Sequence, residues 1–347
     1  MASTPNAAAR VEITDPVSLT NPSGGLNPSA VGWTRTPLHD TDAIGTTWTS
    51  FMRNKRWEYW AVVTPTHIIS LTVSNIDYAG VCALFVLDRA TNTEINTELV
   101  APLAWGVTLP GTLDGGVASV KSRGLDITIT PEEGGTRLQA RSARVSIDIF
   151  AALPKGHERL GVVVPWSEWV FQYTVKDIGL PATGTVTIDG TEIALPPGQS
   201  WATLDHGRGR WPRSITWNWG TGVETQPSGR VVGIQVGGKW TDGTGATENS
   251  LLVDGRVSKI HDELQWTYDI KDLSDKTVEK VWKITGDGVD LKFRVEHVRE
   301  AHTDLKIITS KTWQCFGAWS GTVKDENGKD VVIEAAYGWA EHVEQYW

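Results

Sequence analysis

Apolar and polar residues alternate along most of the chain, which is the pattern of half-buried β-strands. Residues 67–73, 125–130 and 231–236 are clear examples, rich in Val, Ile and Thr. Between such runs stand turn-forming pairs such as Asp189-Gly190 and Asp254-Gly255, which favour tight hairpins. No stretch keeps a helical apolar period over about three turns. The pattern therefore predicts an all-β chain built from antiparallel hairpins.

The runs number about 20, which is more than one tightly closed sheet holds. We therefore expect two closed or nearly closed sheets. Residues 1–30, rich in Pro, Ser, Asn and Gly, are predicted to form an irregular tail. The first domain is placed at residues 31–253 and the second at 254–347, with the boundary at the Asp254-Gly255 turn. Boundaries from about 190 to 255 also fit the pattern.

The composition is unusual in its aromatic residues. The 347 residues include 18 Trp but only 6 Phe and 6 Tyr. Tryptophan offers a broad apolar ring, a face that attracts cations and one N–H that needs a partner when buried. This excess fits a core with few large elements, where most of the rings fill space, or a pocket for a large apolar molecule.

Charge and cysteine content exclude several classes of protein. The 41 acidic and 32 basic side chains leave a net charge of −9, so the surface repels phosphate backbones and no nucleic-acid partner is expected. Cys82 and Cys315 stand far apart and are expected to be reduced, buried thiols rather than a disulfide or a metal site. The eight histidines show no paired-ligand spacing, so no metal is predicted.

Neither an export signal nor a membrane segment is apparent. Residues 1–17 lack an apolar core, and no apolar run reaches about 18 residues. The expectation is a cytoplasmic protein with no membrane span.

One motif resembles a phosphate-binding loop. The run from Gly233 to Lys239 fits its first seven positions, but Trp240 stands where Ser or Thr would bind magnesium. No helix follows to present its N–H groups to a phosphate. The glycines therefore predict a bulge or a close backbone approach, and no cofactor is expected.

The segment 201–219 concentrates polar and aromatic chemistry. Asp205 is expected to orient His206 so that its imidazole can give or take a proton. Trp217 and Trp219 share one face of a strand and, with Arg208, would form the wall of a substrate pocket. The alternative is structural: Asp205 and His206 tie a strand end, the tryptophans fill the core and the arginine is solvated.

A second cluster follows in the next hairpin. If that hairpin returns beside the Trp pair, its polar and aromatic side chains reach the same cavity; they are Gln235, Trp240, Glu248 and Asn249. The competing interpretation is a polar loop with turn-forming residues.

These segments carry a resemblance to known families. The run Arg56-Trp57-Glu58-Tyr59-Trp60 and the pair Glu248-Asn249 resemble a bacterial family known only as a domain of unknown function. Leu204-Asp205-His206 and Trp217-Asn218-Trp219 are more remotely similar to the carotenoid 1,2-hydratase family, whose superfamily includes fungal Diels–Alderases. The resemblance implies two lipocalin-like (calycin) antiparallel β-barrels packed together. Gly207-Arg208 replaces the Glu-Trp that follows the His in the hydratases.

The first hypothesis for function is a cofactor-independent lyase, isomerase or cyclase. Its substrate would be a lipophilic unsaturated molecule such as a terpenoid, polyketide or lipid. His206 would supply the proton, and the faces of Trp217 and Trp219 would stabilise a cation by roughly 0.5–2 kcal/mol each. The alternatives are a non-catalytic carrier or sensor of a lipophilic ligand, and a carbohydrate-binding or glycoside-active protein.

Overall fold

The computed structural model describes residues 7–45, 50, 52–273, 275, 277–304 and 309–347. Nearly all of this described chain is β-structure, with 62% strand and 4% helix, which confirms the all-β prediction. The chain divides into two compact units, Glu12–Trp211 and Pro212–Trp347, the latter joined by the first residues up to Val11. The Asp254-Gly255 turn, where the sequence analysis placed the domain boundary, instead joins β19 (Asn249–Val253) to β20 (Arg256–Ile260) within one sheet.

The N-terminal residues form short, irregular pieces rather than long strands. A 3-10 helix, η1, covers Ala7–Arg10, and a second, η2, covers Pro28–Ala30. Between them, β1 (Val17–Ser18) pairs in parallel with β3 (His39–Asp40).

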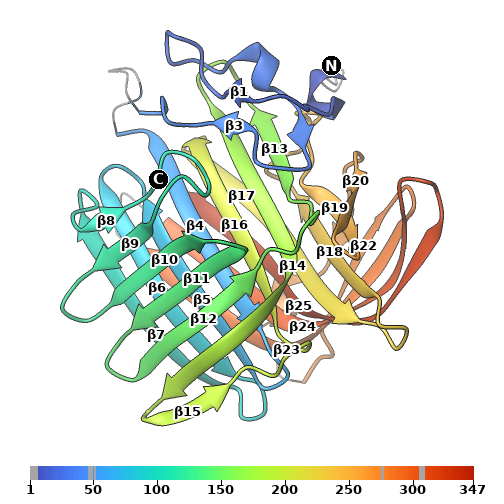
Figure 1. Cartoon of the computed structure of the whole chain (residues 1–347). Coiled ribbons are helices and arrows are strands. Elements are labelled where there is room, and N and C mark those ends of the chain that lie inside the picture. Colours follow the sequence, from blue (N-terminus) through green and yellow to red (C-terminus); the bar gives the residue numbers. More distant parts are fainter. Residues whose placement is uncertain (1–6, 46–49, 51, 274, 276, 305–308) are drawn as a thin grey trace. The chain divides into compact units, whose positions relative to one another are not determined.

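The first unit is one large sheet that forms a nearly closed barrel (Figure 1). In the described chain its strands are β2 (Trp33–Thr34), β4 (Asn54–Val63), β5 (His67–Asn75), β6 (Ala79–Asp88), β7 (Thr93–Pro102), β8 (Val107–Thr108), β9 (Ala118–Lys121), β10 (Asp126–Glu132), β11 (Gly135–Arg141), β12 (Val145–Ala152), β13 (Leu160–Pro165), β14 (Phe171–Ile188), β15 (Thr191–Ala194) and β16 (Trp201–Arg210). The order is β7-β6-β5-β4-β16-β14-β12-β11-β10-β9-β8, with β13 and β15 on β14 and β2 on β13.

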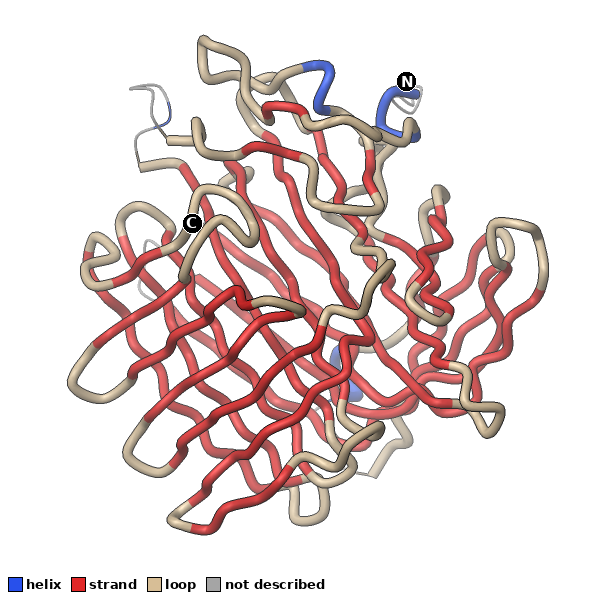
Figure 2. The backbone as a smooth tube through the Cα atoms, in the orientation of Figure 1, coloured by secondary structure: helices blue, strands red, loops and turns tan. Residues whose placement is uncertain are grey.

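A single apolar core explains why this sheet curls. Ile95 on β7 and Val120 on β9 lie near opposite ends of the strand order, yet both belong to one buried cluster with Leu71, Ile147 and Leu204. Every second residue of a strand points to the inner face of the sheet, where the apolar cluster lies. In β12, for example, buried and more exposed residues alternate from Val145 onward. Figure 2 shows that long strands joined by short loops make up most of the chain.

The second unit is an antiparallel half-barrel sheet. Besides β19 and β20, its described elements are β17 (Ser214–Thr225), β18 (Val231–Gly238), β21 (Gln265–Thr267), α1 (Ile270–Leu273), β22 (Val281–Gly286), β23 (Val289–Asp304), β24 (Thr309–Lys324) and β25 (Asp330–Tyr346). The order is β20-β19-β18-β17-β25-β24-β23-β22-β21.

Tryptophan rings dominate the core of the second unit. Trp282 and Trp319 are almost completely buried, and Trp319 packs beside Phe293. The Trp319 ring lies against β17 at Gly222, where a Cβ atom would come within 2.6 Å of Trp319 Cδ1. Glycine is therefore required there for the ring to lie on the strand.

Both cysteines are buried thiols outside any disulfide, and burial raises the pKa of each. Within the described residues, no helix has the length and apolar character needed to cross a bilayer.

Candidate active site

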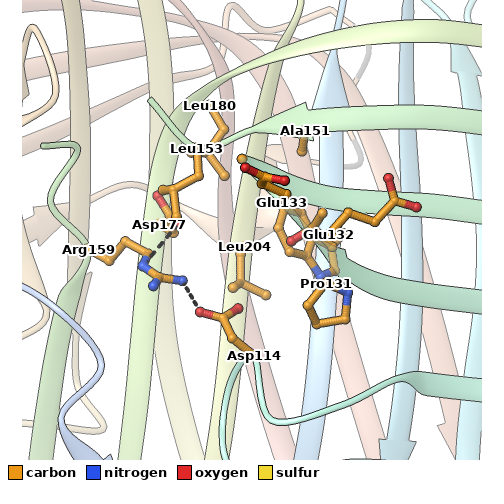
Figure 3. A pocket seen from close by; sticks show the side chains of 14 residues that line it. Asp114, Pro131, Glu132, Glu133, Ala151, Leu153, Arg159, Asp177, Leu180 and Leu204 are labelled. Atoms are coloured by element: carbon orange, nitrogen blue, oxygen red, sulfur yellow. Dashed lines mark hydrogen bonds and ion pairs between the residues drawn. The ribbon is translucent and has the colours of Figure 1, made fainter. Parts of the chain in front are cut away.

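A cavity of about 370 Å³ opens in the first unit, and this volume suits a small organic molecule. Figure 3 shows side chains from several strands converging on it. The apolar part of its wall includes Trp60, Leu153, Leu180 and Leu204. The polar part is formed by Asp114, Glu132, Glu133, Thr136, Arg159 and Asp177.

Asp177 reaches the cavity because β14 is irregular at that point. The register between β14 and β16 shifts between Asp177 and Leu180, and Gly179 adopts a φ of +74°. A bulge of this kind redirects neighbouring side chains, and Gly tolerates the left-handed conformation. The carboxyl group of Asp177 is consequently buried, with 2% of its side chain exposed, yet it still lines the cavity.

Two basic side chains hold Asp177. His157 Nε2 lies 2.9 Å from Asp177 Oδ1 and donates to it, and the His157 side chain is itself only 3% exposed. Arg159 Nε lies 3.9 Å from Asp177 Oδ2, while Arg159 Nη1 donates to Asp114 Oδ2 over 2.7 Å. Figure 3 marks these two contacts of Arg159. The guanidinium therefore bridges the two carboxyl groups.

The environment favours the protonated form of Asp177. Burial raises its pKa above the ordinary value for an aspartic acid, and the nearby Asp114 charge acts in the same direction. His157 and Arg159 oppose this effect only in part. The arrangement is a carboxylic acid that keeps its proton at higher pH than usual, set in the wall of a cavity that both apolar and polar side chains line.

No pattern in the sequence predicted this site. His157 and Asp177 are twenty residues apart and form no recognised motif. The available signal was the charged pair Lys176-Asp177 inside a β-strand pattern, between Val175 and Ile178. A charged residue buried in such a run requires a partner, but the pattern does not indicate which one.

The predicted hydrogen bond between Asp205 and His206 is not formed. The two residues are consecutive on β16, so their side chains point to opposite faces. Asp205 Oδ1 lies 2.8 Å from Lys176 Nζ, and Asp205 Oδ2 accepts from Trp57 Nε1 over 3.1 Å. The expectation that Asp205 orients His206 is therefore wrong.

His206 instead faces Glu58 and Arg208. Its Nδ1 lies 3.7 Å from Glu58 Oε1, beyond hydrogen-bond distance, and Arg208 Nη2 lies 3.5 Å from the same oxygen. His206 and Arg208 are completely buried, and burial followed by the Arg208 charge lowers the pKa of His206 to about 4. Arg208 donates to the backbone oxygens of Trp57 and Pro110. The structural alternative had placed this arginine in solvent.

The six other predicted site residues lie in the second unit. Trp217 Nε1 donates to Glu341 Oε1 over 2.9 Å, and Trp219 Nε1 donates to Gln235 Oε1 over 2.8 Å. The next hairpin brings together a similar set: Trp240 Nε1 donates to Glu248 Oε1 over 2.8 Å, and Asn249 Oδ1 accepts from the backbone N–H of Gly237. The structure thus joins Trp219 with Gln235 and Trp240 with Glu248, while Asp205, His206 and Arg208 belong to the first unit.

No group of three or more potential metal ligands converges anywhere in the described ranges of the chain.

A nearly closed barrel and a half-barrel sheet in one chain define a two-part, lipocalin-like β fold similar to that of hydratases. Within this class, the chain belongs to the family described as "Domain of unknown function (DUF2804)", which matches residues 10–347. Both parts of the resemblance noted in the sequence are confirmed. No curated protein matches the chain significantly in sequence.

Solved structures share the fold at low sequence identity. Kievitone hydratase from Nectria haematococca is 14% identical, and the match covers 85% of this chain and 89% of that one with a TM-score of 0.51. CghA is 12% identical, with 85% and 88% coverage and a TM-score of 0.52. At these identities, the comparison establishes the fold alone.

Proposed function

We propose that the protein is a cofactor-independent lyase, isomerase or cyclase in which Asp177 transfers the proton. The observation that carries the proposal is the buried Asp177 carboxyl group in the cavity wall, hydrogen-bonded to His157. Asp177 takes the role of acid that was first expected for His206, because His206 is enclosed by protein and does not line the cavity. The fold shared with kievitone hydratase supports the reaction class by analogy.

The cavity wall suits a substrate with an apolar body and no negative charge. Leu153, Leu180 and Leu204 would contact hydrocarbon, whereas the carboxyl groups of Glu132 and Glu133 would repel an anion. We therefore favour a neutral, unsaturated or hydroxylated molecule of the terpenoid, polyketide or lipid type.

Loss of water from a hydroxylated substrate shows how Asp177 would give a proton and take one back. Asp177 gives its proton to a substrate hydroxyl group, the C–O bond breaks, and its electron pair leaves with water. The resulting carboxylate, held by His157 and Arg159, takes a proton from the adjacent carbon, and the C–H electron pair forms the double bond. Hydration is the reverse. The surrounding carboxylates and the Trp60 ring stabilise positive charge at carbon during the reaction.

The experiment begins with the ligand. Protein purified from its own host is examined by native mass spectrometry, and any bound molecule is extracted under denaturing conditions and identified. That molecule is then incubated with fresh protein in D₂O, and chromatography with mass spectrometry follows deuterium at carbon and the gain or loss of one water.

The proposal expects turnover by the wild type and a fall of at least about 100-fold in Asp177→Asn. Asp290→Asn makes the same chemical change at an exposed position of β23 and should retain full activity. A ligand that stays unchanged and gains no deuterium would instead identify a carrier. Binding of oligosaccharides alone would favour the carbohydrate alternative.

A further inference from the structure

A second cluster of proton-transfer groups lies in the second unit, centred on the phenol oxygen of Tyr268. Asn218 Nδ2 donates to Tyr268 Oη over 2.7 Å, and Lys239 Nζ donates to it over 2.9 Å. His342 Nδ1 lies 2.7 Å from the same oxygen and 3.1 Å from Lys239 Nζ. These four side chains come from β17, β25 and two loops of one unit, and the site proposed above uses none of them.

Lys239 is held in an unusual backbone conformation. Its φ of +69° lies in the left-handed region that glycine normally occupies. Asp242 stabilises this turn, because its Oδ1 accepts from the Lys239 backbone N–H over 2.9 Å. The backbone thereby delivers the amine to Tyr268 and His342 while the residue remains exposed. Lys239 is also the last residue of the glycine-rich motif noted in the sequence, and its amine contacts Tyr268 and His342.

The phenol is rigidly placed. The Tyr268 ring stacks on Trp282 with centroids 3.9 Å apart and an interplanar angle of 8°. Asn218 is fully buried and anchored by a second bond from Nδ2 to the Glu341 backbone oxygen. Burial raises the pKa of Tyr268 to about 12, and the Asn218 hydrogen bond opposes this shift, so the phenol holds its proton until a stronger acceptor takes it.

His342 is placed to accept a proton. Only 2% of it is exposed, and its Nε2 lies 3.4 Å from Glu344 Oε1. Burial lowers its pKa, and the Lys239 charge lowers it further, so the ring is neutral at pH 7 and Nδ1 is an acceptor. Glu344 opposes this shift and would stabilise the imidazolium once formed.

The amine of Lys239 is prepared for loss of its proton. Burial lowers its pKa, while Glu344 and Asp242 act in the opposite direction. In the described structure, its Nζ lies within hydrogen-bond distance of both Tyr268 Oη and His342 Nδ1, and the residue is exposed, so an incoming molecule can reach it.

We propose that Lys239 forms a Schiff base with an aldehyde or unhindered ketone, with Tyr268 and His342 moving the protons. The ammonium passes a proton to His342 Nδ1, and the free amine forms a C–N bond to the carbonyl carbon. The carbonyl oxygen takes the Tyr268 proton, and the nitrogen of the adduct gives a proton back to the phenolate. His342 then returns its proton to the hydroxyl group, which leaves as water. The net change is ammonium plus carbonyl to protonated imine plus water, which needs no oxidant or reductant.

Reductive trapping tests the proposal on the full-length protein. Benzaldehyde and sodium cyanoborohydride are added at neutral pH, and peptide mass spectrometry measures the initial rate of benzylation at each lysine. Lys292, an exposed lysine on β23, is the internal reference. Lys239 is expected to react at least about tenfold faster than Lys292, in keeping with acid–base assistance.

The variant Tyr268→Phe separates assisted chemistry from simple exposure. It keeps the ring that stacks on Trp282 and removes only the hydroxyl group, so circular dichroism should be unchanged. The Lys239 rate should fall to about that of Lys292, a loss of roughly tenfold. Equal rates at Lys239 and Lys292 in the wild type would overturn the proposal, as would an unchanged ratio in Tyr268→Phe. Asp177→Asn should leave the trapping rate unaltered, which keeps this test independent of the proposed function.

Discussion

His157 Nε2 donates to Asp177 Oδ1 over 2.9 Å, and both side chains are almost completely shielded from solvent. The pair thus places a carboxylic acid, supported by an imidazole, in the wall of a cavity of the first unit. Because burial raises the pKa of Asp177, the pair has consequences for stability as well as for catalysis.

Asp177→Asn should change how stability depends on pH. A carboxyl group whose pKa is higher in the folded state binds its proton more tightly there. Wild-type stability therefore falls as pH rises from about 4, the unfolded value, through the folded pKa of Asp177. Urea unfolding of both proteins from pH 4 to 8 should show a wild-type curve that declines relative to the variant. Parallel curves would show that burial does not shift this group.

His206→Gln should remove a pH dependence of folding stability that has the opposite sign to that of Asp177. The folded pKa of His206 is lowered to about 4 from 6.5, so stability is fully present above pH 6.5 and is lost as pH falls toward 4. The shift corresponds to about 3 kcal/mol. The variant should lose less stability than the wild type over this interval when unfolding is measured at pH 7, 5.5 and 4. An equal loss in both proteins would contradict the assignment.

Asp205→Ala should weaken the fold rather than the chemistry. It removes the ion pair with Lys176 Nζ and the bond from Trp57 Nε1 on the face of β16 away from His206. The pair is only partly buried, since 14% of the Asp205 side chain is exposed, so its loss should cost about 1–3 kcal/mol, at or below the range for a fully buried pair. Once a substrate is known, the pH profile of kcat at a temperature where the variant is folded should match the wild type. A displaced profile would instead restore the catalytic role first expected for Asp205.

Gly222→Ala should destabilise the second unit. The new Cβ would meet Trp319 Cδ1 at 2.6 Å and the Ala336 backbone oxygen at 2.9 Å, so ring and strand must separate. Overpacking of this type costs about 1–3 kcal/mol. Gly124→Ala is the matched control, because nothing lies within 4 Å of its Cβ position. Thermal unfolding followed by tryptophan fluorescence should show a lower Tm for Gly222→Ala alone.

Local pattern was sufficient for the strands. It grouped Trp219, Gln235, Trp240 and Glu248 only as walls of one expected cavity, and the Trp219–Gln235 and Trp240–Glu248 hydrogen bonds appear first in the structure. The same reasoning failed for Asp205 and His206. Adjacent residues on a regular strand face opposite ways, and this geometry outweighs their closeness in sequence.

The sequence by itself determined that the chain is all-β, with hairpins at its Asp-Gly turns, because alternation and turn chemistry act over a few residues. Only the tertiary structure decided which distant groups meet. The bulge beside Gly179 directs Asp177 toward His157 and the cavity. In the second unit, the pairing of β17 with β25 brings Asn218 opposite His342, and Tyr268 reaches both from 50 and 74 residues away. Strand pairing and bulges depend on the packing of the whole sheet around its core, which no local period encodes.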